Sequence, residues 1–543
     1  MGGGIIDFAK RHFNASRKAA FCSAVFVGLI VHLFKFTNTL PNLDSLQNFY
    51  SAQNVLASGR WFLAVACAPS TLFDLPWVTG LLSLLWIGFA TALIVEIFQI
   101  ENPFLIVLTG AFMATFPAVT EIFFYQYTAD GYMFAMLLAA LAVHLTRIES
   151  RSLPRWLAAV GCITLCCGIY QTYVNFALVF AICYFLFALL QNRYDTKTYL
   201  RWCVKQACLF VAGLALYYII WKVCMFAQHV EPTHYQGIDR LGQLKLSGVP
   251  GAVVQVILET GFFFLGHLPG RGTSISIWTV LHLLFVCVFA GVVLYSIVKT
   301  KLVRRKGQFV LFIAGAAAIP FAAFFWIFAT SDIEYMGFRM KHSFCALFIL
   351  AIVLFEQYAR LHWKGVMTAL IVCMIVNNAL TANIHYFYLQ RMWDKSYAAA
   401  TEMVTRLHEA DDGTARYLVV VGREANATDP NYIDKSTLGY YYYFQLNTLL
   451  RDEYNTALYL GNVMEFSLRY YTEHPDETPT FAVSETSTHG HMNSQFSLID
   501  DKAQRDAFIM SDAVHAMTNW PAAGSVQKIG DALVVKYSDE TPK

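Results

Sequence analysis

Eleven segments of the chain are apolar over the length of a membrane crossing, and no other feature constrains the fold as strongly. A helix needs about 20 apolar residues to cross the hydrocarbon of a bilayer. A further apolar stretch at 249–270 is interrupted by Pro, Gly and Glu259, so we expect it to be re-entrant or interfacial. The sequence thus predicts an α-helical polytopic membrane protein. The segments lie at about 19–36, 77–97, 103–120, 131–146, 156–170, 173–190, 207–226, 277–298, 309–329, 343–359 and 365–384.

The composition agrees with this fold class and argues against several others. Of the 543 residues, 57% are hydrophobic and 14% are charged, whereas a soluble domain usually carries about 25% charged residues. A net charge of +2 argues against nucleic acid as a partner. The 12 cysteines all precede residue 374 and mostly lie in apolar segments, so they indicate neither a disulfide framework nor a zinc site.

The distribution of lysine and arginine predicts the orientation, because short cytoplasmic loops are enriched in these residues. With the N-terminus in the cytoplasm, 18 of them fall in cytoplasmic segments and 6 in the opposite loops. An odd number of crossings then places the polar C-terminal part outside. Residues 1–386 would form the transmembrane catalytic domain, and 387–543 an extracytoplasmic domain.

The C-terminal part combines one helical stretch with short strands. Helical periodicity at 394–410 is followed by β-rich runs at 415–422, 478–485 and 531–538. Alternating helices and strands are typical of a small α/β domain. An "HGH" sequence at 489–491 is a weak metal motif, and a solvated loop is the favoured interpretation. The tyrosine run at 440–446 could stack on sugar rings or pack its aromatics in a helix.

The acidic residues are concentrated in the loops that the charge bias places outside. A transporter usually places polar groups near the middle of the membrane, between broken helices. Here they gather at one surface, which favours catalysis at the outer interface. No G-x-G-x-x-G and no P-loop is present, so no nucleotide site is evident. The outer acids are Asp44, Asp74, Glu121, Asp130, Glu231, Asp239, Glu259, Asp332 and Glu334.

A transferase outside the membrane needs an activated donor that is delivered within the bilayer, and a polyprenyl-phosphate sugar meets that need. A carboxylate must accept the proton of the acceptor hydroxyl. One or two cations must stabilise the leaving phosphate, and arginine binds phosphate in a bidentate manner. Asp44 lies a few residues beyond the first apolar segment and so meets the first requirement.

Several stretches resemble the Gtr-type (type II) O-antigen glucosyltransferase family. They are "LDSLQNFY" and "GRW" after the first segment, "FPAVTEIFFYQYTADGYMFAMLLAALAV" around the fourth, and "CGIYQTYVNFALVF" between the fifth and sixth. The ending "WPAAGSVQKIGDALVVKYS" resembles the C-terminal strand pair of that family. The resemblance implies a GT-C-like membrane glycosyltransferase with a catalytic acid in the first outer loop and a lipid-phosphate donor.

Carried onto this sequence, the resemblance assigns the catalytic acid to Asp44, and the chemistry adds Asp130 as a second candidate. Either carboxylate could instead cap a helix. We expect the donor phosphate to be bound at Arg60, Arg339 and Lys341. Alternatively, Arg60 anchors at the headgroups and the other two form an ordinary positive boundary. The candidate substrate-binding residues are Trp61, Glu121, Tyr132, Tyr170, Gln171, Asp332 and Glu334.

The sequence therefore predicts an inverting hexosyltransferase of the bacterial inner membrane, with its active site and C-terminal domain in the periplasm. It would transfer glucose from polyprenyl-phosphate-glucose to a glycan acceptor, O-antigen or lipopolysaccharide. One alternative is a GT-C enzyme with another sugar or acceptor, such as teichoic acid or lipid A. Another is a flippase or polymerase of lipid-linked glycans. The acids could also bind Mg²⁺ or Mn²⁺, but we expect no obligatory metal or other cofactor, because arginine alone can neutralise the phosphate.

Overall fold

A computed structural model describes residues 14–48, 55–232, 246–265, 277–329, 336–359, 361–424, 448–450, 452–477 and 502–539. These residues form two compact units. The first unit comprises residues 14–39 and 55–384, with the gaps given above. The second comprises residues 40–48 together with the described residues from 385 onward.

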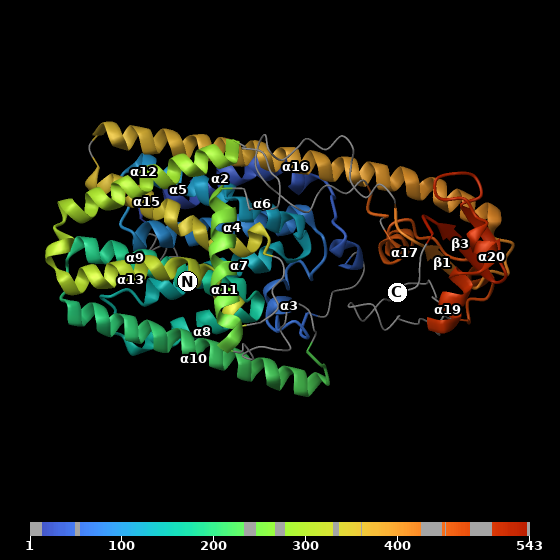
Figure 1. Ribbon diagram of the computed structural model, residues 1–543, viewed down its shortest axis with the longest axis horizontal. Helices are drawn as coiled ribbons and strands as arrows, with labels where there is room; N and C mark the ends of the chain where they lie inside the picture. Colours follow the sequence, from blue (N-terminus) through green and yellow to red (C-terminus); the bar gives the residue numbers. More distant parts are fainter. Residues whose placement is uncertain are drawn as a thin grey trace, which may run out of the picture. The chain divides into compact units, whose positions relative to one another are not determined.

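The first unit is a bundle of apolar helices (Figure 1). Ten helices of the described part are long and apolar enough to cross a membrane, so the chain is a polytopic membrane protein. The helices of this unit are α2 (Ala15–Thr37), α3 (Leu63–Ala66), α4 (Pro76–Ile97), α5 (Pro103–Thr115), α6 (Pro117–Phe124), α7 (Gln126–Leu145), α8 (Leu153–Ile169), α9 (Thr172–Gln191), α10 (Thr196–Gln228), η3 (Leu246–Gly248), α11 (Val249–Leu265), α12 (Ile277–Lys299), η4 (Leu302–Arg304), α13 (Lys306–Ala323), α14 (Phe325–Ala329), η5 (Phe338–Phe344), α15 (Cys345–Tyr358) and the first part of α16 (Leu361–Ala410).

All eleven predicted segments are helical in the part that the structure describes, and ten of them reach 18 residues when α5 is taken together with α6 and η5 with α15. The exception is the predicted segment 156–170, which forms the shorter α8 of 17 residues. At 1.5 Å per residue, a helix of this length rises about 25 Å, close to the hydrocarbon thickness of a bilayer. Its polar N-terminal flank explains the shortness, because Pro154 occupies the first turn and fixes where the helix begins.

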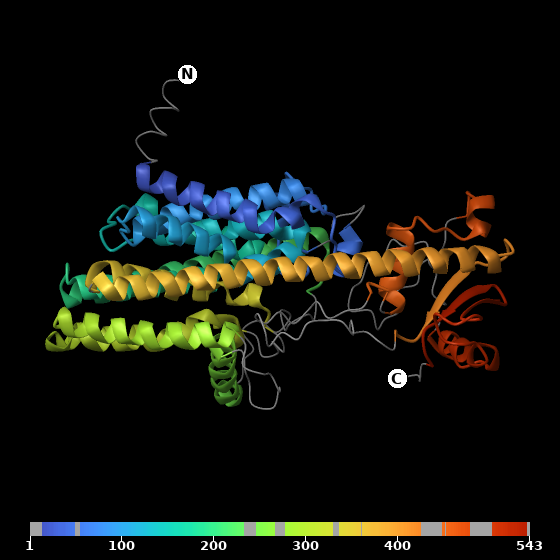
Figure 2. The same cartoon turned by 90° about the horizontal axis from the view of Figure 1, so that it is seen from above.

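Helix α11 is oriented differently from the other apolar helices of the unit. Figures 1 and 2 both show α11 running across the direction of α10, α12 and α13. An interfacial helix lies in the membrane plane, across the spans. The orientation therefore supports the interfacial interpretation of this stretch, which the proline, glycine and glutamate in its sequence had suggested.

Two helix breaks place polar residues at one end of the bundle. Helix α5 ends before Pro117, which begins α6, and α6 ends at Tyr125, where α7 begins. The residue before a proline disfavours the helical conformation, which explains the first break. Glu121 and Asp130 were expected in an outer loop, and this placement was wrong. They lie within α6 and α7 respectively, and both are buried.

The second unit contains a small mixed sheet, as the sequence predicted. The strands are β1 (Tyr417–Val421), β2 (Val526–Ile529) and β3 (Ala532–Lys536), in the order β1-β3-β2. Strand β3 pairs in parallel with β1 and antiparallel with β2. The predicted run 478–485, the tyrosine run and the "HGH" sequence lie outside the described residues. The helices of this unit are η1 (Asp44–Asn48), the end of α16, α17 (Glu453–Asn462), α18 (Arg469–Glu473), α19 (Lys502–Ile509) and α20 (Asp512–His515).

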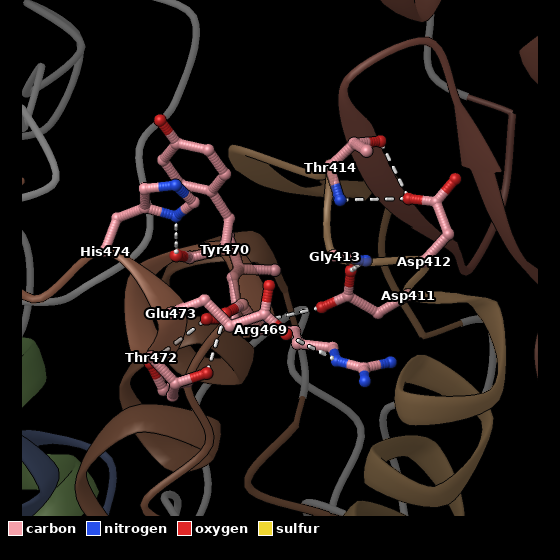
Figure 3. Close-up of polar contacts among 11 residues, drawn as sticks. Asp411, Asp412, Gly413, Thr414, Arg469, Tyr470, Thr472, Glu473 and His474 are labelled. Carbon is pink, nitrogen blue, oxygen red and sulfur yellow. Dashed lines mark hydrogen bonds and ion pairs between the residues drawn. The ribbon is translucent and has the colours of Figure 1, made fainter.

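A polar cluster joins the end of α16 to the beginning of α18 (Figure 3). The Asp411 carboxylate accepts a hydrogen bond from the backbone N–H of Gly413 at 2.9 Å and another from that of Arg469 at 2.9 Å. A carboxylate at the first turn of a helix is favourable, because the N–H groups there have no partner within the helix. Asp411 thus fixes the turn after α16 against α18.

Candidate active site

The turn that precedes the "GRW" triplet is held by side chains of α9 and α10. Three of its carbonyl oxygens accept side-chain hydrogen bonds, from Trp221 to Leu56 at 2.9 Å, from Gln171 to Ser58 at 2.8 Å, and from Tyr217 to Gly59 at 3.1 Å. Gly59 has φ = +79°, a conformation that favours glycine. Arg60 follows directly, so the direction of its side chain depends on this turn.

Trp61 packs on α8, and its predicted contact with substrate stays a prediction. A Cβ atom at Gly168 would lie 2.7 Å from the Trp61 ring, so the glycine is what permits this approach. The backbone N–H of Phe62 donates to the Gly168 carbonyl oxygen at 2.8 Å in the same place. Trp61 therefore anchors the chain after Arg60 to the end of α8.

Arg60 lies over a pair of stacked tyrosines. Its guanidinium carbon is 5.1 Å from the centre of the Tyr170 ring, within the range of a cation–π contact. The rings of Tyr170 and Tyr132 stack with centres 4.3 Å apart and planes 8° from parallel. Arg339 lies at the junction of α6 and α7, where its guanidinium donates a hydrogen bond to the Tyr125 hydroxyl at 3.1 Å. Four predicted site residues, from four separate segments, thus meet where α6 joins α7 and α8 joins α9, an end that we call the junction end.

Arg339 is held in place by Glu121. Its guanidinium donates to the Glu121 carboxylate at 2.9 Å, and its backbone N–H donates to the same carboxylate at 2.5 Å. The guanidinium also donates to the Tyr125 hydroxyl at 3.1 Å and lies 4.4 Å from the centre of the Tyr125 ring. Only 5% of the Glu121 side chain and 11% of the Arg339 side chain are exposed. Glu121 therefore orients Arg339, and this pair is a buried ion pair whose two members depend on each other.

Lys341 has a different environment from the two arginines. Its side chain is 1% exposed, and its ammonium group lies 2.7 Å from the Glu259 carboxylate of α11. The same ammonium group lies 4.7 Å from the centre of the Phe262 ring. This ion pair joins η5 to α11, and the role of Lys341 at the donor phosphate stays a prediction.

Asp130 is a buried carboxylate inside α7, near the turn that carries Cys67 and Ser70. One oxygen accepts a hydrogen bond from the Gly131 backbone at 3.0 Å, and the other has no hydrogen-bond partner within the described ranges. Burial, together with the nearby Asp130 charge, raises the pKa of the Cys67 thiol. Asp130 does not cap α7, so the capping alternative is wrong; the residue preceding that helix is Tyr125.

Asp44 belongs to the second unit, with the sequence around η1. Its side chain is exposed. The capping oxygen of η1 comes from Asn42, which accepts hydrogen bonds from the backbone and hydroxyl of Ser45 at 2.8 and 2.9 Å. Asn462 of α17 donates to the Leu46 carbonyl oxygen at 2.7 Å and fixes η1 to this unit. The capping role and the base role of Asp44 both stay predictions.

Two further predicted residues, Asp332 and Glu334, lie outside the described residues. Among the residues that the structure does describe, no group of three or more histidine, cysteine or acidic side chains could hold a metal ion. The expectation that no metal is required stays a prediction.

Sequence reasoning missed residues that support the junction end. Tyr217 and Trp221 were read only as part of an apolar span, yet they contact the turn before Arg60. Their spacing of four residues places both on one face of α10, and a pair of aromatic polar groups near a span end was the available signal. Tyr125 and Glu259 were not assigned roles either, because their partners lie far away in the sequence.

A family model described as glucosyl transferase GtrII matches residues 33–354, more than half of the chain. The chain belongs to this family. It is therefore a membrane glucosyltransferase, and the matched range contains every residue of the junction end discussed above. No curated protein and no solved structure matches the chain.

Proposed function

We propose that this GtrII glucosyltransferase takes glucose from a polyprenyl-phosphate donor and transfers it to a glycan acceptor, with inversion at the anomeric carbon. The presence of two guanidinium groups at the junction end, Arg60 over the Tyr170 ring and Arg339 on the Tyr125 hydroxyl, is the observation that supports the donor most. Tyr170 stacks on Tyr132 of α7, and Tyr125 directly precedes α7, so both cations lie at this end of the bundle. Leaving phosphates are commonly stabilised by such paired arginines, because charged hydrogen bonds to phosphate are strong.

The stacked tyrosines suit the sugar of such a donor. Tyr132 and Tyr170 stack with their ring planes nearly parallel and Arg60 lies over Tyr170, and aromatic rings offer apolar faces to the C–H groups of a sugar. In the proposed reaction, the acceptor hydroxyl attacks the anomeric carbon of glucose while the bond from that carbon to the phosphate oxygen breaks. Polyprenyl phosphate leaves, and its developing charge is stabilised by Arg60 and Arg339. The proton of the acceptor hydroxyl passes to a carboxylate base, which the resemblance to the family assigns to Asp44.

The proposed acceptor is O-antigen or another part of lipopolysaccharide, in the periplasm of a bacterium with the enzyme in its inner membrane. The charge bias of the loops supports this sidedness, because it places the junction end and the C-terminal unit outside. No nucleotide-sugar pool exists there, which favours a donor that the membrane itself delivers.

The test of this proposal compares donors with purified protein in detergent. Polyprenyl-phosphate-glucose should release polyprenyl phosphate only when a glycan acceptor is present, and the new glucosidic bond should have the opposite anomeric configuration to the donor. UDP-glucose should give no product. Turnover of UDP-glucose, or a retained configuration, would contradict the proposal, and movement of the intact lipid without transfer would instead indicate a flippase.

The orientation can be tested by cysteine labelling in intact cells. A maleimide that does not cross membranes should label Asp512→Cys above the wild-type background, since this residue is exposed in the second unit. It should not label Arg304→Cys, an exposed residue in η4. Labelling of the second variant alone would reverse the orientation, because the two positions are predicted to lie on opposite sides of the membrane.

The proposal requires no metal, since the two arginines supply the positive charge. Transfer by the purified protein should therefore keep its rate after exhaustive treatment with EDTA. Mg²⁺ or Mn²⁺ added afterwards should not raise that rate. Complete loss of transfer in EDTA, with recovery on adding a divalent ion, would show that the phosphate is neutralised by a metal.

A further inference from the structure

We infer that Gln171 and Tyr217 are positioning residues that direct the Arg60 guanidinium toward the donor phosphate. This inference rests on the proposed function, in which Arg60 binds that phosphate. It assigns Gln171 a role different from the substrate contact that its sequence position suggested.

The hydrogen bonds of Gln171 are directed at protein atoms. Its side-chain nitrogen donates to the Ser58 carbonyl oxygen at 2.8 Å and to the Tyr217 hydroxyl at 3.2 Å. A glutamine amide carries two N–H donors, so both are already used. A direct donation from Gln171 to a sugar or phosphate would first have to break one of these bonds. The amide nitrogen therefore serves the turn, and only the amide oxygen could still accept a hydrogen bond from a substrate.

Tyr217 completes the network from the neighbouring helix. Its hydroxyl accepts the bond from Gln171 and donates to the Gly59 carbonyl oxygen at 3.1 Å. One α9 side chain and one α10 side chain thus hold two successive carbonyl groups of the turn. Arg60 is the next residue, so the peptide that these bonds orient is the one that carries the Arg60 side chain.

At Gly59 the turn packs closely against Gln171 and Tyr217. A Cβ atom at this position would collide with the Tyr217 hydroxyl and would lie 2.7 Å from the Gln171 amide nitrogen. The positive φ of Gly59 also disfavours any other residue. The turn can therefore take only one position against Gln171 and Tyr217. In that position the Arg60 guanidinium contacts the Tyr170 ring.

The contact between Arg60 and Tyr170 links the hydrogen bonds of Gln171 and Tyr217 to the candidate active site. Tyr170 precedes Gln171 in the chain, at the junction of α8 and α9. Gln171 also accepts a hydrogen bond from Trp326 at its backbone oxygen, at 2.7 Å, which fixes this residue against α14. Residues 170–171 thus supply both the ring that contacts the Arg60 guanidinium and the amide that hydrogen-bonds to the turn before Arg60.

The experiment is a double-mutant cycle in which the KM for the donor is measured for each single and double variant. Gln171→Met keeps the volume and removes both donors, whereas Tyr217→Phe removes only the hydroxyl. Each should raise the donor KM about 2- to 10-fold, the range expected for one neutral hydrogen bond, and leave the acceptor KM unchanged. In an Arg60→Gln background, either change should have no further effect on the donor KM, because the group that the network positions is already gone.

Asn175→Ala provides the matched control. Asn175 lies four residues after Gln171 on α9, is buried, and donates one hydrogen bond to the Ala323 carbonyl oxygen at 2.9 Å. Its loss should lower the melting temperature and leave the donor KM unchanged in both backgrounds. A melting curve of each variant shows whether it folds. If Gln171→Met does not fold, Tyr217→Phe still tests the inference, because it keeps the aromatic ring and removes only the hydroxyl.

The outcomes separate the inference from the function on which it rests. The same rise in donor KM in the wild-type and Arg60→Gln backgrounds would overturn the positioning role, as would lowered stability with no change in donor KM. An unchanged donor KM in Arg60→Gln itself would instead contradict the proposed phosphate ligand.

Discussion

Replacement of Asp44 by asparagine is expected to lower glucosyl transfer at least 100-fold while donor binding is retained. Asparagine has the size of aspartate but cannot take a proton, and general-base catalysis typically contributes about 10²–10⁴-fold. Asn42 accepts two hydrogen bonds from Ser45, and asparagine at position 44 can cap a helix as aspartate can, so the substitution keeps the local structure of η1. The measurement is the kcat of purified Asp44→Asn, with its melting temperature and its affinity for polyprenyl-phosphate-glucose.

Asn42→Ala is the matched control, because it removes the cap and keeps the carboxylate. Loss of a capping side chain costs about 0.5–2 kcal/mol of stability. This variant should melt at a lower temperature and keep its kcat. Near wild-type transfer by well-folded Asp44→Asn would move the base to Asp130, the buried carboxylate in α7.

Arg60→Gln is expected to weaken donor binding about 10- to 150-fold. Loss of a hydrogen bond to a charged group costs about 1.5–3 kcal/mol, and each 1.4 kcal/mol corresponds to a factor of ten. Arg60 is a cleaner probe than Arg339, since removing Arg339 would leave the buried Glu121 carboxylate without its ion-pair partner. The measurement is the donor KM at saturating acceptor.

Arg304→Gln controls for the loss of one positive charge from the protein. Arg304 is exposed in η4, far from α6–α9 in the sequence. Its removal should leave the donor KM within about twofold of the wild type, because exposed charges contribute little. Equal donor KM values for Arg60→Gln and Arg304→Gln would show that Arg60 does not bind the phosphate.

The sequence predicts the membrane-spanning fold well, because each span carries its own signal. Length and hydropathy identify a crossing helix without reference to any other part of the chain. The same holds for β1 and β3, which lie in the predicted runs 415–422 and 531–538 and are rich in β-branched residues, whereas β2 was expected only from the resemblance. Helix α8 departs from the expected count only because its apolar run is 17 residues long.

The placement of Glu121 and Asp130 could not be predicted in this way. Each charge interrupts an apolar run and so suggests a loop, yet both residues lie in helices. The Glu121 charge is compensated by Arg339, which lies 218 residues later. Hydropathy is a local property, whereas the partner that makes a buried charge tolerable is set by the tertiary structure.

The role of Gln171 illustrates the same limit for the site. The "YQ" pair was recognised from the sequence, and Tyr170 does lie beside Arg60. The amide of Gln171, however, donates to the Ser58 carbonyl oxygen and to the Tyr217 hydroxyl, beside a turn whose shape depends on Gly59. The residue type was informative, but the choice between a substrate contact and a structural contact depended on the folded turn.

Photocrosslinking with polyprenyl phosphate tests the central claim most directly, since this lipid is the proposed leaving group. A photoactivatable analogue should label peptides that contain residues 55–62, 168–173 or 336–344, which meet at the junction end. Unlabelled polyprenyl phosphate should compete, and Arg60→Gln should reduce the labelling. Labelling confined to peptides around residues 146–155 and 299–306, at the opposite ends of the helices, would contradict the assignment of the donor site to the junction end.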